Sequence, residues 1–109
     1  MISYEAHEVT PGHIELRLSG ELVIGAETAK VRACLSPLVE KFAQVTVDLK
    51  SLRRIDSTGI GVLVMAYAKA RNHGHRLLAT NVGGTVRDTL LLVKLLAVLD
   101  PECMTPQAA

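Results

Sequence analysis

The sequence lacks the features that mark most nucleic-acid-binding, membrane-spanning and secreted proteins. Its 12 Lys and Arg residues nearly balance its 11 Asp and Glu residues, without a block of like charge, so electrostatic capture of nucleic acid or of an anionic membrane is not expected. Aromatic residues make up only 3% of the chain, which is too few for platforms that stack on bases. No apolar run approaches the roughly 20 residues that span a bilayer, and the first residues show no signal-peptide pattern. We therefore expect a cytoplasmic protein without membrane insertion.

Motifs for redox, metal and catalytic chemistry are also lacking. The two cysteines, Cys34 and Cys103, are far apart and outside any Cys-x-x-Cys motif, as expected for thiols in a reducing compartment. Gly83-Gly84 is not followed by the Lys-Ser/Thr of a nucleotide-binding loop. A serine nucleophile needs a base within reach, and no such constellation, nor a third metal ligand, is evident around His7, His13, His73 and His75. The sequence predicts a protein that is not an enzyme and needs no cofactor or metal.

The length of 109 residues suits one domain over 1–109. Alternating apolar positions indicate strands, and apolar positions three or four residues apart indicate helices. The expected strands lie at 2–8, 13–19, 44–49 and 76–82, and the expected helices at 25–42, 58–72 and 85–93. An N-terminal hairpin followed by strand–helix alternation predicts an α/β fold, a small mixed sheet of about four to five strands packed with about three to four helices.

Local signals predict how these elements are joined. Thr10-Pro11-Gly12 should form a tight hairpin turn, and Pro37 should kink the first helix or make it restart near Ser36. The segment 50–53 should be a polar turn, and 85–88 resembles a capping box that opens the third helix. Gly74 is expected to be the C′ glycine just past the second helix. The ordered part of the domain should cover about residues 2–100, with a short edge strand near Val98, and 101–109 should be a frayed tail.

The stretch from Arg54 to Val64 carries the functional signal. Asp56-Ser57-Thr58-Gly59 follows an apolar strand and precedes a long apolar helix, so it should form a strand-to-helix turn with Ser57 or Thr58 at the N-cap. Free amides and a partial positive charge make a helix N-terminus attractive to anions. Two hydroxyls in this position, beside the carboxylate of Asp56, therefore indicate a phosphorylation site.

The octamer from Asp56 to Leu63 is very similar to the signature of the STAS domain, as found in bacterial anti-sigma factor antagonists. The segment 18–22 resembles the exit of the family's second strand, and 45–49 resembles the strand that leads to its site, so the resemblance covers about residues 2–100. It implies that Ser57 is phosphorylated and that the partner is an anti-sigma factor with serine-kinase activity, bound when Ser57 is unphosphorylated. The chain departs from the family at Val23, where many antagonists have Asp.

Other roles for the site residues stay open at this point. Ser57 would serve only as a helix cap in a protein without the switch, and Thr58 is the alternative phosphoacceptor. Asp-Ser-Gly and Asp-Thr-Gly loops occur in aspartic proteases, but a second copy is lacking, so we expect Asp56 to shape the turn. Gly59 and Gly61 either allow close helix packing or leave room for a partner beside Ser57.

The helix after the motif is apolar on more than one side. On a helical wheel, Ile60, Leu63, Val64 and Tyr67 form the face expected in the core. The opposite face carries Val62, Met65, Ala66 and Lys69, and is either covered by another helix or a surface for a partner. We expect Val62, Met65 and Lys69, together with Glu21 at the second-strand exit, to bind the partner.

A second function is compatible with the same resemblance. STAS domains also dock on membrane transporters and lipid-transport complexes, where the signature serine would serve as a contact. The resemblance alone does not choose between a switch and a transporter module.

Overall fold

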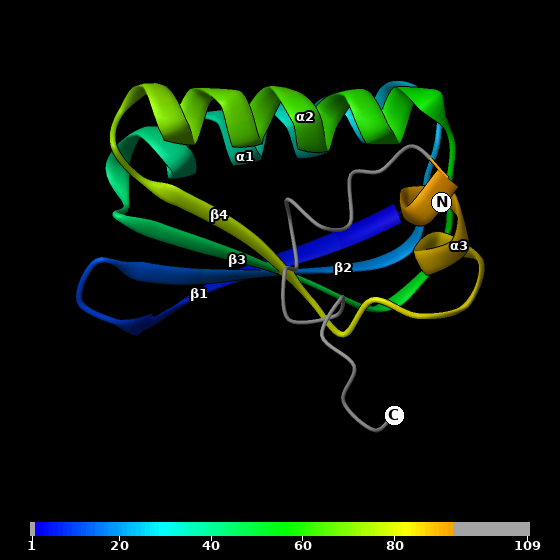
Figure 1. Cartoon of the computed structure of the whole chain (residues 1–109), viewed down its shortest axis with the longest axis horizontal. Helices are drawn as coiled ribbons and strands as arrows, with labels where there is room; N and C mark the ends of the chain where they lie inside the picture. The colour runs from blue at the N-terminus through cyan, green and yellow to red at the C-terminus, as the bar shows by residue number, and fades with distance from the viewer. Residues whose placement is uncertain (1, 93–109) are drawn as a thin grey trace.

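The computed structural model describes residues 2–92. Within this range the chain forms four strands, β1 (Ile2–Thr10), β2 (His13–Leu22), β3 (Gln44–Ile55) and β4 (Arg76–Thr80), and three helices, α1 (Ala26–Lys41), α2 (Ser57–Asn72) and α3 (Gly84–Leu92) (Figure 1). The strands make one sheet in the order β1-β2-β3-β4. Strand β1 is antiparallel to β2, and the other two pairs are parallel. The predicted α/β fold with a mixed sheet is confirmed, whereas the edge strand expected near Val98 and the tail from 101 lie outside the described residues.

The β1–β2 hairpin forms as its turn residues predict. Thr10 pairs with His13, so Pro11 and Gly12 are the two residues of the loop. Gly12 has a φ of 85°, which suits the third position of a type II turn, while proline favours the second. The local signal thus fixes the position of the turn, and the pairing of the two strands shifts by one residue between Glu8 and Thr10.

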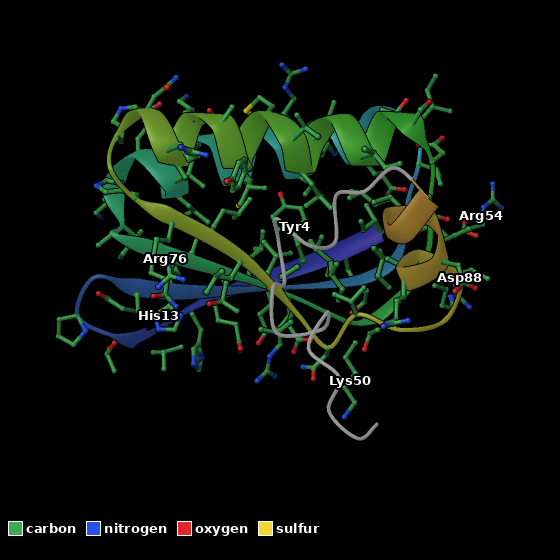
Figure 2. All side chains as sticks on the ribbon, in the orientation of Figure 1. Tyr4, His13, Lys50, Arg54, Arg76 and Asp88 are labelled. Carbon is green, nitrogen blue, oxygen red and sulfur yellow. The ribbon has the colours of Figure 1, made fainter. Side chains whose placement is uncertain are left out.

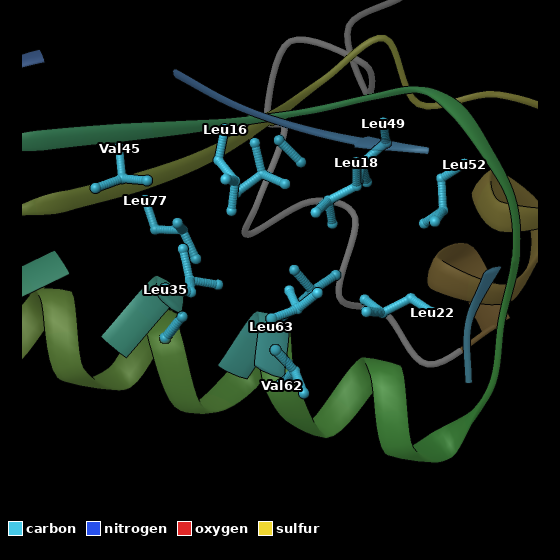
Figure 3. Close-up of a cluster of buried hydrophobic side chains, with 14 of the residues drawn as sticks. Leu16, Leu18, Leu22, Leu35, Val45, Leu49, Leu52, Val62, Leu63 and Leu77 are labelled. Atoms are coloured by element: carbon cyan, nitrogen blue, oxygen red, sulfur yellow. The ribbon is translucent and has the colours of Figure 1, made fainter. Parts of the chain in front are cut away.

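Helices α1 and α2 cover one face of the sheet, and α3 lies beside its end (Figure 1). The core forms where alternate residues of the strands face these helices (Figure 3), and its largest fully buried side chains are Leu16, Leu18, Leu22, Leu35, Leu49, Leu63, Val31, Val39 and Val45. The opposite face of the sheet is polar. There Arg17 Nε lies 3.1 Å from Glu15 Oε1, and His13 Nε2 lies 2.7 Å from Thr46 Oγ1. One face buried and one face polar is the arrangement that the alternation in β2 predicts.

Strand β3 is longer than the sequence predicts. The segment 50–53, expected to be a polar turn, continues the strand to Ile55. The β2–β3 register shifts between Arg17 and Ser19, so Leu49 and Leu52, three residues apart, are both buried. A register shift breaks the period of two on which the strand prediction relied.

Two helix predictions also need correction. Helix α1 continues through Pro37, so of the two outcomes expected there, a kink or a restart near Ser36, the restart does not occur. Its buried residues Leu35 and Val39 flank the proline with no exposed area, and their burial offsets the backbone bond that proline cannot form. Thr85 lies inside α3, and its hydroxyl donates to the carbonyl of Arg53 at 2.9 Å. The predicted capping box is therefore wrong, and Thr85 instead links α3 to the end of β3.

Candidate functional site

The turn between β3 and α2 is built around the carboxylate of Asp56. Its Oδ1 accepts hydrogen bonds from the amides of Thr58, at 2.9 Å, and Gly59, at 3.1 Å. Asp56 has extended backbone angles and is the N-cap, so α2 begins at Ser57. The expectation that Ser57 or Thr58 caps the helix is wrong. The carboxylate one residue earlier reaches the amides of the second and third helical residues, which is the geometry of a capping aspartate.

The same carboxylate fastens a second segment to the site. Asp56 Oδ2 accepts a hydrogen bond of 2.9 Å from the amide of Ile24, in the loop between β2 and α1. The buried hydroxyl of Thr28 donates to the carbonyl of Val23 in that loop. The pKa of Asp56 is held below its usual value, chiefly by the hydrogen bond from Ile24. The bonds from Gly59 and Thr58 and the charge of Arg54 lower it further, while partial desolvation acts in the opposite direction. The predicted turn-shaping role of Asp56 thus includes a tether that joins two loops.

Replacing Asp56 by asparagine tests this tether through its pH dependence. The folded-state pKa of Asp56 is depressed, so its carboxylate stabilises the fold above the unfolded-state pKa, about 3.9, and this contribution is lost as pH falls below that value through the folded-state pKa. We expect the wild type to be more stable than Asp56→Asn at pH 7, and the gap to shrink below about pH 4. Urea unfolding of both proteins at pH 7, 5, 4 and 3 measures the gap. A gap that stays constant over this range would contradict a role for the charge.

The two glycines of the first turn have different surroundings. A Cβ on Gly59 would lie 2.1 Å from the carbonyl oxygen of Leu22 and 2.7 Å from Cγ1 of Ile55. A Cβ on Gly61 would meet nothing within 4 Å. Of the two readings of these glycines, close packing therefore describes Gly59, while Gly61 leaves open space on the surface near Ser57.

That open space belongs to a groove of about 560 Å³ between the N-terminal halves of α1 and α2. Its lining comes from the loop after β2, from α1 and from α2: Ile24, Gly25, Thr28, Ala29, Arg32, Ser57, Thr58, Gly61 and Val62. Ser57 and Thr58 are exposed, and the Ile24 side chain is 78% exposed. The groove thus joins the predicted phosphoacceptor to an exposed apolar residue that the sequence reasoning missed, although its place just after a buried strand end was a usable signal.

The predicted apolar surface on α2 is not where the sequence placed it. Val62 is 4% exposed and Ala66 fully buried, so these residues belong to the core. Helix α1 packs along this side of α2, as the alternative reading had it. The exposed positions of α2 instead include Ser57, Gly61, Val64, Ala68 and Arg71. Val64, expected in the core, is 44% exposed.

The other predicted partner-binding residues occupy separate places. Glu21 lies at the groove end of the sheet, where its Oε2 is 3.6 Å from Nη1 of Arg54, and Arg54 projects beside α3 (Figure 2). Lys69 lies about three helical turns from Ser57 and binds Ser36 and Glu40 of α1. This contact lowers the pKa of Glu40. The structure therefore places Glu21 at the same end of the sheet as Asp56 and Ser57, whereas Lys69 links the two helices. Met65, between Ser57 and Lys69 along α2, is half-buried.

Two other kinds of feature, a metal-binding cluster and a membrane-spanning helix, are not found in the part of the chain that the structure describes. Between residues 2 and 92, no group of three or more His, Cys, Asp or Glu side chains is placed to hold a metal ion. In the same range, no helix is long and apolar enough to cross a membrane.

Comparisons with known proteins bear on the family and the fold. A family model described as the Mlab STAS domain matches residues 6–100. The solved structure of the anti-sigma factor antagonist SpoIIAA in its unphosphorylated form is similar with a TM-score of 0.78 and 20% identity, covering 94% of this chain and 93% of that one. The structure of the phosphorylated form of SpoIIAA from Bacillus is similar with a TM-score of 0.73 and 19% identity, covering 94% of this chain and 96% of that one. The structure of a sulfate transporter family protein from Wolinella succinogenes is similar with a TM-score of 0.70 and 18% identity, covering 88% of this chain and 78% of that one. No curated protein sequence matches the chain.

Proposed function

This chain belongs to the STAS domain family, and on that premise we propose that it is an anti-sigma factor antagonist, a protein-binding module rather than an enzyme. In its unphosphorylated form it binds an anti-sigma factor that has serine-kinase activity. Phosphorylation of Ser57 by this partner ends the binding. The observation that carries the proposal is the position of Ser57, exposed at the first residue of α2 and at the groove between α1 and α2.

The bonding of the turn supports modification at this residue. The amides of Thr58 and Gly59 bind Asp56, while the Ser57 hydroxyl has no hydrogen bond to any residue of the described range 2–92. Ser57 is therefore free to enter a kinase active site, and a change at its hydroxyl leaves the turn intact.

The surface around Ser57 supports partner binding. Gly61 and Val64 continue the exposed side of α2 beyond Ser57, and Ile24 extends it across the groove. A phosphate adds about −1.5 to −2 charges next to Asp56, and these charges would have to be desolvated when the partner docks. Modification thus weakens the complex without unfolding the protein.

Substitutions of Ser57 separate the switch from the fold. Ser57→Ala should change the free energy of unfolding by less than about 0.5 kcal/mol, because the residue is exposed and does not cap the helix. It should bind the partner kinase but resist phosphorylation, while Ser57→Asp should bind more weakly. Incubation with ATP and a co-encoded kinase-like protein, followed by intact mass and peptide mapping, measures modification, and calorimetry measures binding.

The controls are ATP without the kinase and the neighbouring variant Thr58→Ala. Phosphate should map to Ser57, should not appear with ATP alone, and should still appear on Thr58→Ala. Equal affinities for the Ala and Asp variants would rule out the switch, and phosphate on Thr58 would move it to the next residue.

A STAS module that regulates a membrane transporter or lipid-transport complex is the second candidate. It is favoured by the likeness to the Wolinella sulfate transporter family protein and by a TM-score of 0.66 with the murine anion transporter Slc26a9. Pull-down from the native host with mass spectrometry separates the two. Recovery of a permease or a lipid-transport ATPase, with no kinase-like protein, would replace the antagonist by the transporter module.

A further inference from the structure

A phosphate on Ser57 finds the usual anion site of a helix N-terminus already occupied. The amides of Thr58 and Gly59, which would bind an external anion, donate instead to Oδ1 of Asp56. The third bond of this carboxylate, from Ile24, holds it in place. A phosphate on the adjacent residue therefore meets a fixed negative charge and lacks these two amides, which leaves a nearby cationic side chain as the group that can offset its charge.

Arg32 is the cationic side chain that lines the same groove as Ser57. It is exposed, and within residues 2–92 its guanidinium has no ion pair or hydrogen bond. Arg53 and Arg54, at the end of β3, are not among the groove residues, and Arg54 lies 3.6 Å from Glu21. Arg32 is thus the available partner for an anion in the groove.

The arrangement of the two helices directs Arg32 toward Ser57. Helices α1 and α2 follow strands whose last residues, Leu22 and Ile55, are paired in the parallel sheet, so both helices begin at the same end of the molecule. Long side chains on a helix point back toward its N-terminus. A long side chain at Arg32, which lines the groove together with Ser57 and Gly61, is consequently expected to lean toward the end of the groove where Ser57 lies.

We propose that Arg32 binds the phosphate of phosphorylated Ser57 and that this pair closes the groove. A guanidinium binds phosphate through two parallel hydrogen bonds, which joins α1 to the start of α2 across the groove mouth. The phosphorylated state is then held by an internal contact that occupies the partner's space, in addition to the charge that repels it. This inference rests on the proposed function because that function supplies the phosphate. The contact between the phosphate and Arg32 is argued from the groove alone.

The test installs phosphoserine at position 57 by genetic encoding and titrates it by ³¹P NMR at low ionic strength. A cation that binds the dianion favours proton release. We expect the second dissociation constant of the phosphate to be at least about threefold larger in the wild type than in Arg32→Gln, and Arg32→Lys to lie between them. The difference should shrink at high salt, as an exposed ion pair requires.

Lys30→Gln is the matched control, because it removes the same charge from an exposed position of α1 that does not line the groove. It should titrate like the wild type. Equal titration curves for Arg32→Gln and Lys30→Gln would overturn the proposal. The experiment contains no partner or kinase, so a negative result would refute only the contact between Arg32 and the phosphate. Absence of kinase-dependent phosphorylation would instead refute the proposed function.

Discussion

Gly59→Ala is expected to destabilise the protein by about 3 kcal/mol, because the site has no room for one methyl group. The added Cβ would lie 2.1 Å from the carbonyl oxygen of Leu22 and 3.0 Å from its Cγ. That oxygen accepts the amide of Asp56 at 3.3 Å, so it cannot withdraw without disturbing the N-cap. The expected loss is a large part of the roughly 5–15 kcal/mol by which domains are stable.

Gly61→Ala is the matched control two residues further along the same helix. Its Cβ would have nothing within 4 Å, so alanine should keep or raise stability by up to about 1 kcal/mol through its better helix propensity. Thermal and urea unfolding of both variants measures the contrast, with a loss of roughly 10–20 °C expected for Gly59→Ala. Similar midpoints for the two variants would show that the start of α2 can move away from Leu22.

Val62→Lys should cost about 3 kcal/mol, although the sequence placed Val62 on an exposed surface. The side chain is 4% exposed, and a buried charge without a partner is among the most destabilising changes. Urea unfolding at neutral pH measures the loss. Near-native stability would mean that the lysine escapes through the adjoining groove, which Val62 also lines.

The same substitution at Val64 separates core from surface. Val64 is 44% exposed, so Val64→Lys should change stability by less than about 0.5 kcal/mol. If the exposed side of α2 binds the partner, Val64→Lys should also lower partner affinity, which calorimetry measures. Unchanged affinity would move the contact surface away from this side of the helix, toward Ile24 and the loop after β2.

The parts of this protein that sequence reasoning predicted are those determined by residues near one another in the chain. The hairpin turn required only Pro11 and Gly12. The end of α2 required only Gly74, whose φ of 72° is the left-handed conformation expected just past a helix. The motif at Asp56 and Ser57 likewise located a strand-to-helix turn, because turn and cap preferences act over a few residues. These local signals were sufficient to predict the order of elements and the position of the candidate site.

Other features depended on contacts between distant segments, and only the tertiary structure decided them. Helix α2 is apolar on several sides, so its own sequence could not show that α1 buries Val62 and leaves Val64 exposed. Asp56 became a tether through a bond to Ile24, 32 residues away. Gly59 and Gly61 look alike in the sequence, and the carbonyl of Leu22 distinguishes them. In each case the deciding energy is packing or a hydrogen bond between elements, which becomes defined only when the elements are assembled.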